Sequence, residues 1–181
     1  MLPDGRGKMK INTERLVMVP LGLEHLVSTH KYAGDLANTK YMVHLPNTDM
    51  DETRSFLQKV QDEWKKPVPE FYEFAVLLDN EHIGAVSIDI EQDKAEGELG
   101  WIIGKEYWGN GYAVEAAREV INFAVQECKV KKIIAHCDSE NINSYKVMKK
   151  LGMLLVSKER GRKNKLSDED REELMCALEI S

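Results

Sequence analysis

EGELGWIIGKEYWGNGYAV, residues 96–114, is the stretch that decides how this chain folds. It reads as an apolar strand over Leu99–Ile103, a short loop, and a glycine-containing turn that leads into a helix. Backbone N–H groups at the start of a helix have no intrahelical partner, and the helix dipole adds partial positive charge there. Gly109 and Gly111 lack a Cβ, so a phosphate can approach the backbone closely. The stretch therefore predicts a site for a pyrophosphate.

The residues after this turn predict a helix, a strand, a second helix and two final strands. Apolar residues recur at helical spacing over 113–128, the strongest helical period in the chain. A short strand is predicted over 131–137, and a helix over 141–151 that Gly152 ends. The last strands are expected over 153–158 and 172–180, joined by a charged loop that is basic first and acidic after.

The residues before the turn predict one strand, two helices and a hairpin. They are a strand over 11–20 that Pro20 ends, helices over 23–36 and 49–65 with an irregular loop over 38–47, and hairpin strands over 71–78 and 82–90. Asp49 or Asp51 is expected to cap the second helix, and Asp79-Asn80 to form the hairpin turn. No linker divides the chain, so residues 1–181 are predicted to form a single domain. Met9 opens a plausible true start, which makes residues 1–8 a disordered extension.

Composition narrows the classes of function. The 181 residues are 43% hydrophobic, as in ordinary globular proteins, and carry a formal net charge of −6. This balance argues against a nucleic-acid partner and is compatible with a cationic substrate. No CxxC pair or other ligand spacing predicts a metal, and the three scattered cysteines fit a reducing compartment. Without a long apolar run or a signal peptide, no membrane contact is expected and a cytoplasmic location is predicted.

The glycine turn alone leaves several interpretations open. A dinucleotide-binding turn would follow the first strand and have an acidic residue about 20 positions further on. A Walker A loop would need a Gly-Lys-Ser/Thr run, which is missing from the sequence. A plain strand-to-helix turn remains as the structural alternative.

A second motif, NINSYKVMKKLGM at residues 141–153, changes this balance. Together with Trp108-Gly109-Asn110-Gly111-Tyr112-Ala113 it resembles the GNAT superfamily of N-acetyltransferases. Asn141, Ser144 and Lys150-Leu151-Gly152 stand at the motif positions, and Met153 replaces the usual Phe. INTERLVMVP, ELGWII and YWGNGYAVEA further resemble the branch that contains the ribosomal-protein alanine N-acetyltransferases. The resemblance spans residues 11–180.

The resemblance implies an α/β fold with a mixed, mostly antiparallel, V-shaped sheet of about seven strands and about four helices. It also implies acetyl-CoA as co-substrate. The pyrophosphate would lie on the turn, and the pantetheine arm would enter between the strands at 99–103 and 131–137. The residues it assigns to the co-substrate are Trp101, Ile102, Ile103, Trp108, Gly109, Asn110, Gly111, Tyr112, Ala113, Val114, Asn141, Ser144 and Lys150. Asn141 would also serve as an N-cap of the last helix, and Lys146 and Lys149 are further candidates for a phosphate contact.

Acetyl transfer to an amine needs a base, because a free amine is mostly protonated near neutral pH. Glu98 is the candidate base, since it lies in the apolar strand two residues after Glu96 and on the same face. Many family members use a Tyr as the acid that protonates the thiolate, but this chain has Met148 at that position. In this branch the Ser of the motif is the proposed acid, which nominates Ser144.

The acceptor is expected to be a primary amine, either a protein N-terminus or a small molecule. Tyr41, His44 and Trp64 are candidate contacts, and Phe71-Tyr72 is either an aromatic wall or plain core. His136 and Cys137 are predicted to point to opposite faces of a strand, which argues against a Cys/His dyad. Two other classes remain: a silent acyl-CoA sensor, and a module that binds another phosphate ligand. A monomer and a homodimer are both compatible with the sequence.

Overall fold

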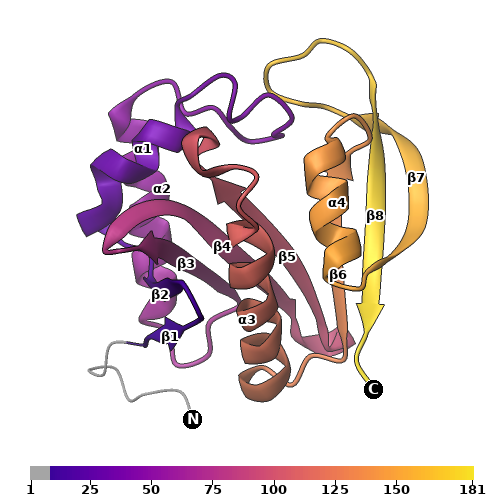
Figure 1. Cartoon of the computed structure of the whole chain (residues 1–181), viewed down its shortest axis with the longest axis horizontal. Coiled ribbons are helices and arrows are strands. Elements are labelled where there is room, and N and C mark those ends of the chain that lie inside the picture. Colours follow the sequence, from indigo (N-terminus) through magenta and orange to yellow (C-terminus); the bar gives the residue numbers. More distant parts are fainter. Residues whose placement is uncertain (1–8) are drawn as a thin grey trace.

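The computed structural model describes residues 9–181, so the extension expected over residues 1–8 lies outside the described part of the chain. Within that part, eight strands form one sheet and four α-helices flank it (Figure 1). The sheet order is β1-β2-β3-β4-β5-β6-β8-β7. The strands are β1 (Ile11–Asn12), β2 (Leu16–Pro20), β3 (Phe71–Leu78), β4 (Glu81–Glu91), β5 (Glu96–Ile103), β6 (Lys132–Asp138), β7 (Leu154–Arg162) and β8 (Arg171–Glu179). The helices are α1 (Leu26–Ala33), α2 (Met50–Trp64), α3 (Tyr112–Glu127) and α4 (Ile142–Lys150).

The sheet opens into a V between β5 and β6. All other neighbouring strands are antiparallel, whereas these two are parallel and pair only over Glu96–Glu98 and Lys132–Ile134. Beyond Glu98 the strands diverge, as Figure 1 shows. The predicted mixed, mostly antiparallel, V-shaped fold is confirmed. The β6-facing edge of β5 beyond Glu98 therefore has no strand partner, so its backbone groups are available to a ligand.

The sheet has eight strands rather than about seven because the segment predicted as one strand over 11–20 folds as a short hairpin. Ile11 pairs with Met18 and Asn12 with Val17. Thr13 closes the turn, since its hydroxyl accepts a hydrogen bond from the Leu16 amide at 2.9 Å. This turn brings Thr13 and the residues beside it toward the start of α3.

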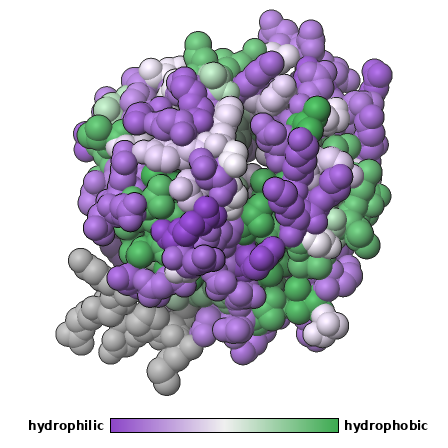
Figure 2. All heavy atoms as spheres, viewed as in Figure 1, coloured by the Kyte–Doolittle hydropathy of each residue, from purple (hydrophilic) through white to green (hydrophobic). Residues whose placement is uncertain are grey.

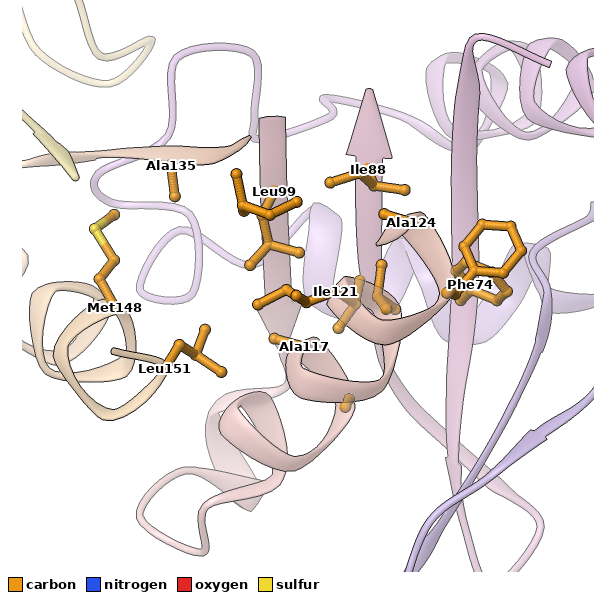
Figure 3. Close-up of a cluster of buried hydrophobic side chains, with 14 of the residues drawn as sticks. Phe74, Ile88, Leu99, Ala117, Ile121, Ala124, Ala135, Met148 and Leu151 are labelled. Atoms are coloured by element: carbon orange, nitrogen blue, oxygen red, sulfur yellow. The ribbon is translucent and has the colours of Figure 1, made fainter. Parts of the chain in front are cut away.

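Apolar side chains cover both faces of the sheet. On one face, residues of β3, β4 and β5 pack against α3 and α4, as Figure 3 shows for Phe74, Ile88 and Leu99. Met148 of α4 is fully buried on the same face. On the other face, alternate residues such as Ala75 and Ala85 pack against α1 and α2. We call these the α3 face and the α1/α2 face.

The predicted hairpin and caps are confirmed, with changes at several boundaries. Asp79 and Asn80 both have positive φ, as a two-residue hairpin turn requires, and the Asp49 side chain caps α2 by accepting from the Glu52 amide. The helix predicted over 23–36 is wrong at both ends, because residues 23–25 form a 3₁₀ turn and α1 ends at Ala33. The charged loop is shorter than predicted, because β7 continues to Arg162 and β8 starts at Arg171. Among residues 9–181, none of the helices combines the length and apolar character that a membrane crossing needs.

Candidate active site

The diverging strands open onto a cavity of about 680 Å³. Its walls come from the end of β5, the turn before α3, the exposed side of α4, and the connection between α1 and α2. Figure 2 shows this side of the molecule hollowed between the start of α3 and α4. The lining residues are Ala37, Asn38, Lys40, Tyr41, Met42, Trp101, Ile102, Ile103, Tyr107, Trp108, Gly109, Gly111, Tyr112, Ala113, Val114, Asn141, Asn143, Ser144, Lys146, Val147 and Lys150.

The turn before α3 presents backbone groups to this cavity. Gly109 and Gly111 have φ of 79° and 80°, a left-handed conformation that residues with a Cβ adopt at a cost. Gly111 is the N-cap of α3 and has no side chain with which to bond the first N–H groups of the helix. Those N–H groups therefore stay available to an anion, and the helix dipole favours one there.

A clamp from the first hairpin holds this turn in place. The Arg15 amide donates to Glu115 of α3 at 2.8 Å, and the Arg15 guanidinium donates to the same carboxylate at 2.7 Å. The guanidinium also donates to the backbone oxygen of Asn110 at 3.0 Å and lies 4.6 Å from the centre of the Tyr112 ring. The Thr13 hydroxyl donates to Glu115 as well. Arg15 therefore fastens the turn and the first residues of α3 to the sheet.

Helix α4 supplies the opposite wall. Asn141 caps the helix, since its side-chain oxygen accepts from the Ser144 amide at 3.2 Å, and both residues also line the cavity. Lys146 and Lys150 line it too, whereas the Lys149 ammonium lies over the Tyr145 ring. Met148, at the position where many family members carry a Tyr, is 0% exposed and belongs to the core. Of the two hydroxyl residues in this part of α4, only Ser144 lines the cavity.

All but one of the residues predicted to hold the co-substrate line this cavity. The exception is Asn110, whose side-chain amide donates to the backbone oxygens of Tyr107 and Trp108 and so stabilises the turn. Trp108 has a second role in the turn, because its indole N–H donates to the Ile103 oxygen at 2.7 Å. The structure therefore brings together residues that the sequence separates into two motifs.

Glu98 lies at the vertex of the V, outside the lining of the large cavity. It is the last residue of β5 that pairs with β6, and Oε1 of Glu98 lies 2.9 Å from Nδ1 of His136. This contact lowers the pKa of Glu98 from its usual value and raises the pKa of His136. The pair therefore combines an ionised Glu98 carboxylate with a His136 ring that hydrogen-bonds to it through Nδ1. Sequence reasoning separated His136 from Cys137 correctly by strand alternation, but it did not place His136 within hydrogen-bond distance of Glu98.

The α1–α2 connection contributes contacts that the sequence only partly indicated. Of the three acceptor candidates there and in α2, Tyr41 lines the cavity, while His44 is exposed elsewhere and Trp64 packs between Tyr72 and Phe74. Phe71 and Tyr72 are core residues.

Asn38, in the same connection, was missed. It lines the cavity, is only 8% exposed, and both atoms of its side-chain amide lack a partner among the described residues. The loop around it has no periodic pattern, so no sequence signal marked it.

Comparisons with known proteins agree with this geometry. The family model described as an acetyltransferase (GNAT) domain matches residues 15–154. The chain is 31% identical over 147 residues to the uncharacterized N-acetyltransferase YnaD of Bacillus subtilis, covering 80% of this chain and 82% of YnaD. A crystal structure of a GNAT-family acetyltransferase from Bacillus anthracis has a TM-score of 0.81 at 27% identity, over 94% of this chain and 98% of that one. The structure of RimL, a ribosomal L7/L12 α-N-protein acetyltransferase in complex with coenzyme A, has a TM-score of 0.83 at 16% identity, over 95% and 98% of the two chains. At that identity the likeness shows the fold alone.

Proposed function

The chain belongs to the GNAT acetyltransferase family and is an acetyl-CoA-dependent N-acetyltransferase, and from this premise we propose that its acceptor is a primary amine that approaches β5 from the α1/α2 face. The observation that carries this proposal is the Glu98–His136 pair at the vertex of the V. Glu98 shares its face of β5 with Ile102, which lines the large cavity. A base and a cavity wall thus lie on the same side of one strand.

The large cavity suits the co-substrate. Acetyl-CoA supplies an acetyl group activated as a thioester. We assign its pyrophosphate to the free N–H groups at the start of α3, which Gly109 and Gly111 leave open to close approach. The unpaired edge of β5 beyond Glu98 would bind the pantetheine amides as an added strand. Asn141 and Lys150 on α4 would contact the arm and a phosphate respectively.

Glu98 and His136 would remove the proton that the acceptor must lose. An amine near pKa 10 is mostly an ammonium at neutral pH, so it becomes a nucleophile only after deprotonation. Because the pKa of Glu98 is lowered, its carboxylate stays ionised, attracts an ammonium and accepts a proton directly or through one water. His136 would then pass that proton toward solvent. In the reaction the carbon–sulfur bond breaks, a carbon–nitrogen bond forms, and the thiolate takes up a proton.

Ser144 would protonate the departing thiolate. It lines the cavity from the first turn of α4, whereas Met148 is buried and has no proton to give. A weak acid at this position raises the rate by less than a Tyr would. General acid help is worth about 10²–10⁴-fold, so this substitution slows transfer without abolishing it.

Two classes of acceptor fit this reaction, namely a protein N-terminus and a small amine. RimL is described as acting on a protein N-terminus, and the branch motifs of this chain favour the same class. The overall negative charge favours a cationic small amine equally well. Because one fold accommodates many acceptors, the acceptor class has to be argued from the residues of the site.

The test is a thiol-release screen with acetyl-CoA against small amines and N-terminal peptides. We expect release with at least one acceptor, and a loss of about 10²–10⁴-fold in kcat for Glu98→Gln. The control Glu159→Gln changes an exposed carboxylate on β7 and should match the wild-type chain. Coenzyme A binding by calorimetry without release in the whole panel would favour the acyl-CoA sensor instead. An unchanged rate and pH profile in Glu98→Gln would remove Glu98 from the mechanism.

A further inference from the structure

A second hollow, of about 460 Å³, lies at the end of β4, the turn that follows it and the start of β5. Six of its nine lining residues are carboxylic acids: Glu70, Asp89, Glu91, Asp93, Glu96 and Glu98. None of the nine is a Lys or an Arg. A hollow with this lining attracts cations and repels anions.

The strand register arranges four of these acids as rungs of a ladder on the α1/α2 face. Glu91 lies opposite Glu96, and Asp89 lies opposite Glu98. Residues two apart on a strand share a face, so successive rungs are about 7 Å apart. The next rung places Ser87 opposite Gly100, and the one after it places Ala85 opposite Ile102, which lines the large cavity. The rungs therefore lead from the acidic hollow directly to the acetyl-CoA cavity.

Glu73 extends this arrangement on the third strand. It pairs with Ser87 in the rung between Asp89 and the large cavity, and only 9% of it is exposed. Among the described residues its carboxyl group has no hydrogen-bond or ion-pair partner. A buried carboxyl group without a partner is costly to ionise, and an ammonium group bound beside it would offset that cost.

In this acidic ladder, formed by the Glu91–Glu96 and Asp89–Glu98 rungs and by Glu73, the negative charge of Asp89 has no positive partner in the described part of the chain. The outer rung is neutralised, since Lys94 lies 2.9 Å from Glu91 and Lys132 lies 3.3 Å from Glu96. Glu98 is held by His136, whereas Asp89 has no partner among residues 9–181. Directly opposed like charges destabilise a sheet, and this chain keeps two such pairs in succession.

From this geometry we infer that the acceptor is a diamine or polyamine. Its reacting amine would lie beside Glu98, and a second ammonium group would lie among the carboxylates around Asp89. This inference rests on the proposed function, because it specifies the acceptor of the same site. A short alkyl spacer spans the distance of about 7 Å between neighbouring rungs, and its methylenes would pass over the Ser87 hydroxyl, which lies against Gly100.

The same features disfavour the other amine classes. An amino acid or an aminosugar phosphate would bring an anion toward six acids. A peptide N-terminus would bring one ammonium followed by neutral amides, which leaves Asp89 without a counter-charge. A monoamine would satisfy Glu98 alone.

The test compares matched acceptors in the thiol-release assay. We expect kcat/KM for putrescine to exceed that for butylamine by about 30-fold, because the second ammonium lies among several carboxylates. In Asp89→Asn the ratio of the two kcat/KM values should fall about tenfold, through a higher KM for putrescine. The preference should also shrink as salt is added. Asp89→Asn removes a like-charge pair, so a loss of folding is not expected.

The outcomes separate this inference from the proposed function. Equal kcat/KM for putrescine and butylamine, or a preference that Asp89→Asn leaves intact, would overturn the assignment of the hollow while amine acetylation still stands. A clear preference for N-terminal peptides over both amines would identify a protein acceptor and overturn it as well. If none of the tested acceptors gives thiol release, the proposed function itself is wrong. Glu159→Gln serves as the matched control for charge, because Glu159 is an exposed carboxylate on β7 that lines neither hollow.

Discussion

The two ends of β5 face hollows of opposite character, which we propose as an anion site and a cation site. Around Trp101–Ile103 the strand faces a cavity built from glycine backbone, a helix N-terminus and the lysines of α4, all suited to an anion. Around Glu96–Glu98 it faces a hollow lined by carboxylates, suited to a cation. The anion site depends on backbone conformation within one short stretch. The cation site depends on side chains from different strands that meet only through their register. One strand thus borders a hollow formed largely by residues close together in the sequence and a hollow formed by side chains of separate strands.

The largest expected effect on coenzyme A binding comes from disturbing the backbone of the anion site. Gly111→Val places a β-branched side chain at φ 80° and should weaken coenzyme A binding about 100-fold by calorimetry. Gly161→Val is the control, because Gly161 also has positive φ but lies on β7, away from the cavity. The control should lose stability and keep its affinity. Equal losses of affinity in both variants would mean that the turn acts through general stability.

A change within the acidic ladder should act on stability. Burial, and then the charge of Asp89, raises the pKa of Glu73 to about 8 from its ordinary 4.5. The folded chain therefore binds this proton more tightly than the unfolded chain, so stability falls as the pH rises from about 4.5 to about 8 and then levels off. Glu73→Gln should gain about 2 kcal/mol at pH 9 and nothing near pH 4, measured by urea unfolding. A gain that is the same at both pH values would show that the acid is not the cause.

Loosening the clamp should weaken the anion site without touching its lining. Arg15→Ala removes the bonds to Glu115 and Asn110 and should weaken coenzyme A binding about tenfold, with kcat little changed. Arg15→Lys should recover only part of the affinity, because an ammonium cannot hold both partners in the same fork. Arg54→Ala on the exposed side of α2 is the control. If Arg15→Ala lowers the melting temperature but leaves the affinity intact, Arg15 is structural only.

The smallest effect is expected from His136. Because His136 lowers the pKa of Glu98, His136→Gln should let that pKa rise, and the acid limb of the pH profile of kcat/KM should move to higher pH. Above that limb the rate should fall by less than about tenfold, since Glu98 is still present. If the acid limb of His136→Gln stays at the pH of the wild-type chain, His136 does not influence the proton transfer by Glu98. Glu98→Gln should abolish the limb altogether.

The sequence indicated the features of the proposed anion site but not the acidic ladder, for a physical reason. The helix period over 113–128, the glycines of the turn and the cap at Asn141 are short-range features, and each appears in the structure where the pattern places it. Glu98 was identified from its own strand. Its partner His136 was not, because that contact depends on a parallel register between β5 and β6.

The same reasoning explains the errors in element boundaries. The end of β7 was predicted as loop because KERGR has no apolar alternation, yet both faces of this edge strand are largely exposed and need none. The segment over 11–20 was predicted as one strand because Thr13 gives no strong turn signal. Its hydroxyl closes the turn by a side-chain hydrogen bond, which only the folded chain reveals.

By itself, the sequence indicated the family, most of the order of the elements, and the glycine turn at the start of a helix where we propose that a phosphate binds, because those features depend on residues close together in the chain. Its motifs also nominated Glu98 and Ser144. Only the tertiary structure decided that Arg15 holds the turn, that His136 holds Glu98, and that acids from three strands form one ladder. Side chains distant in sequence meet through strand register and helix packing, and these are set by burial over the whole sheet.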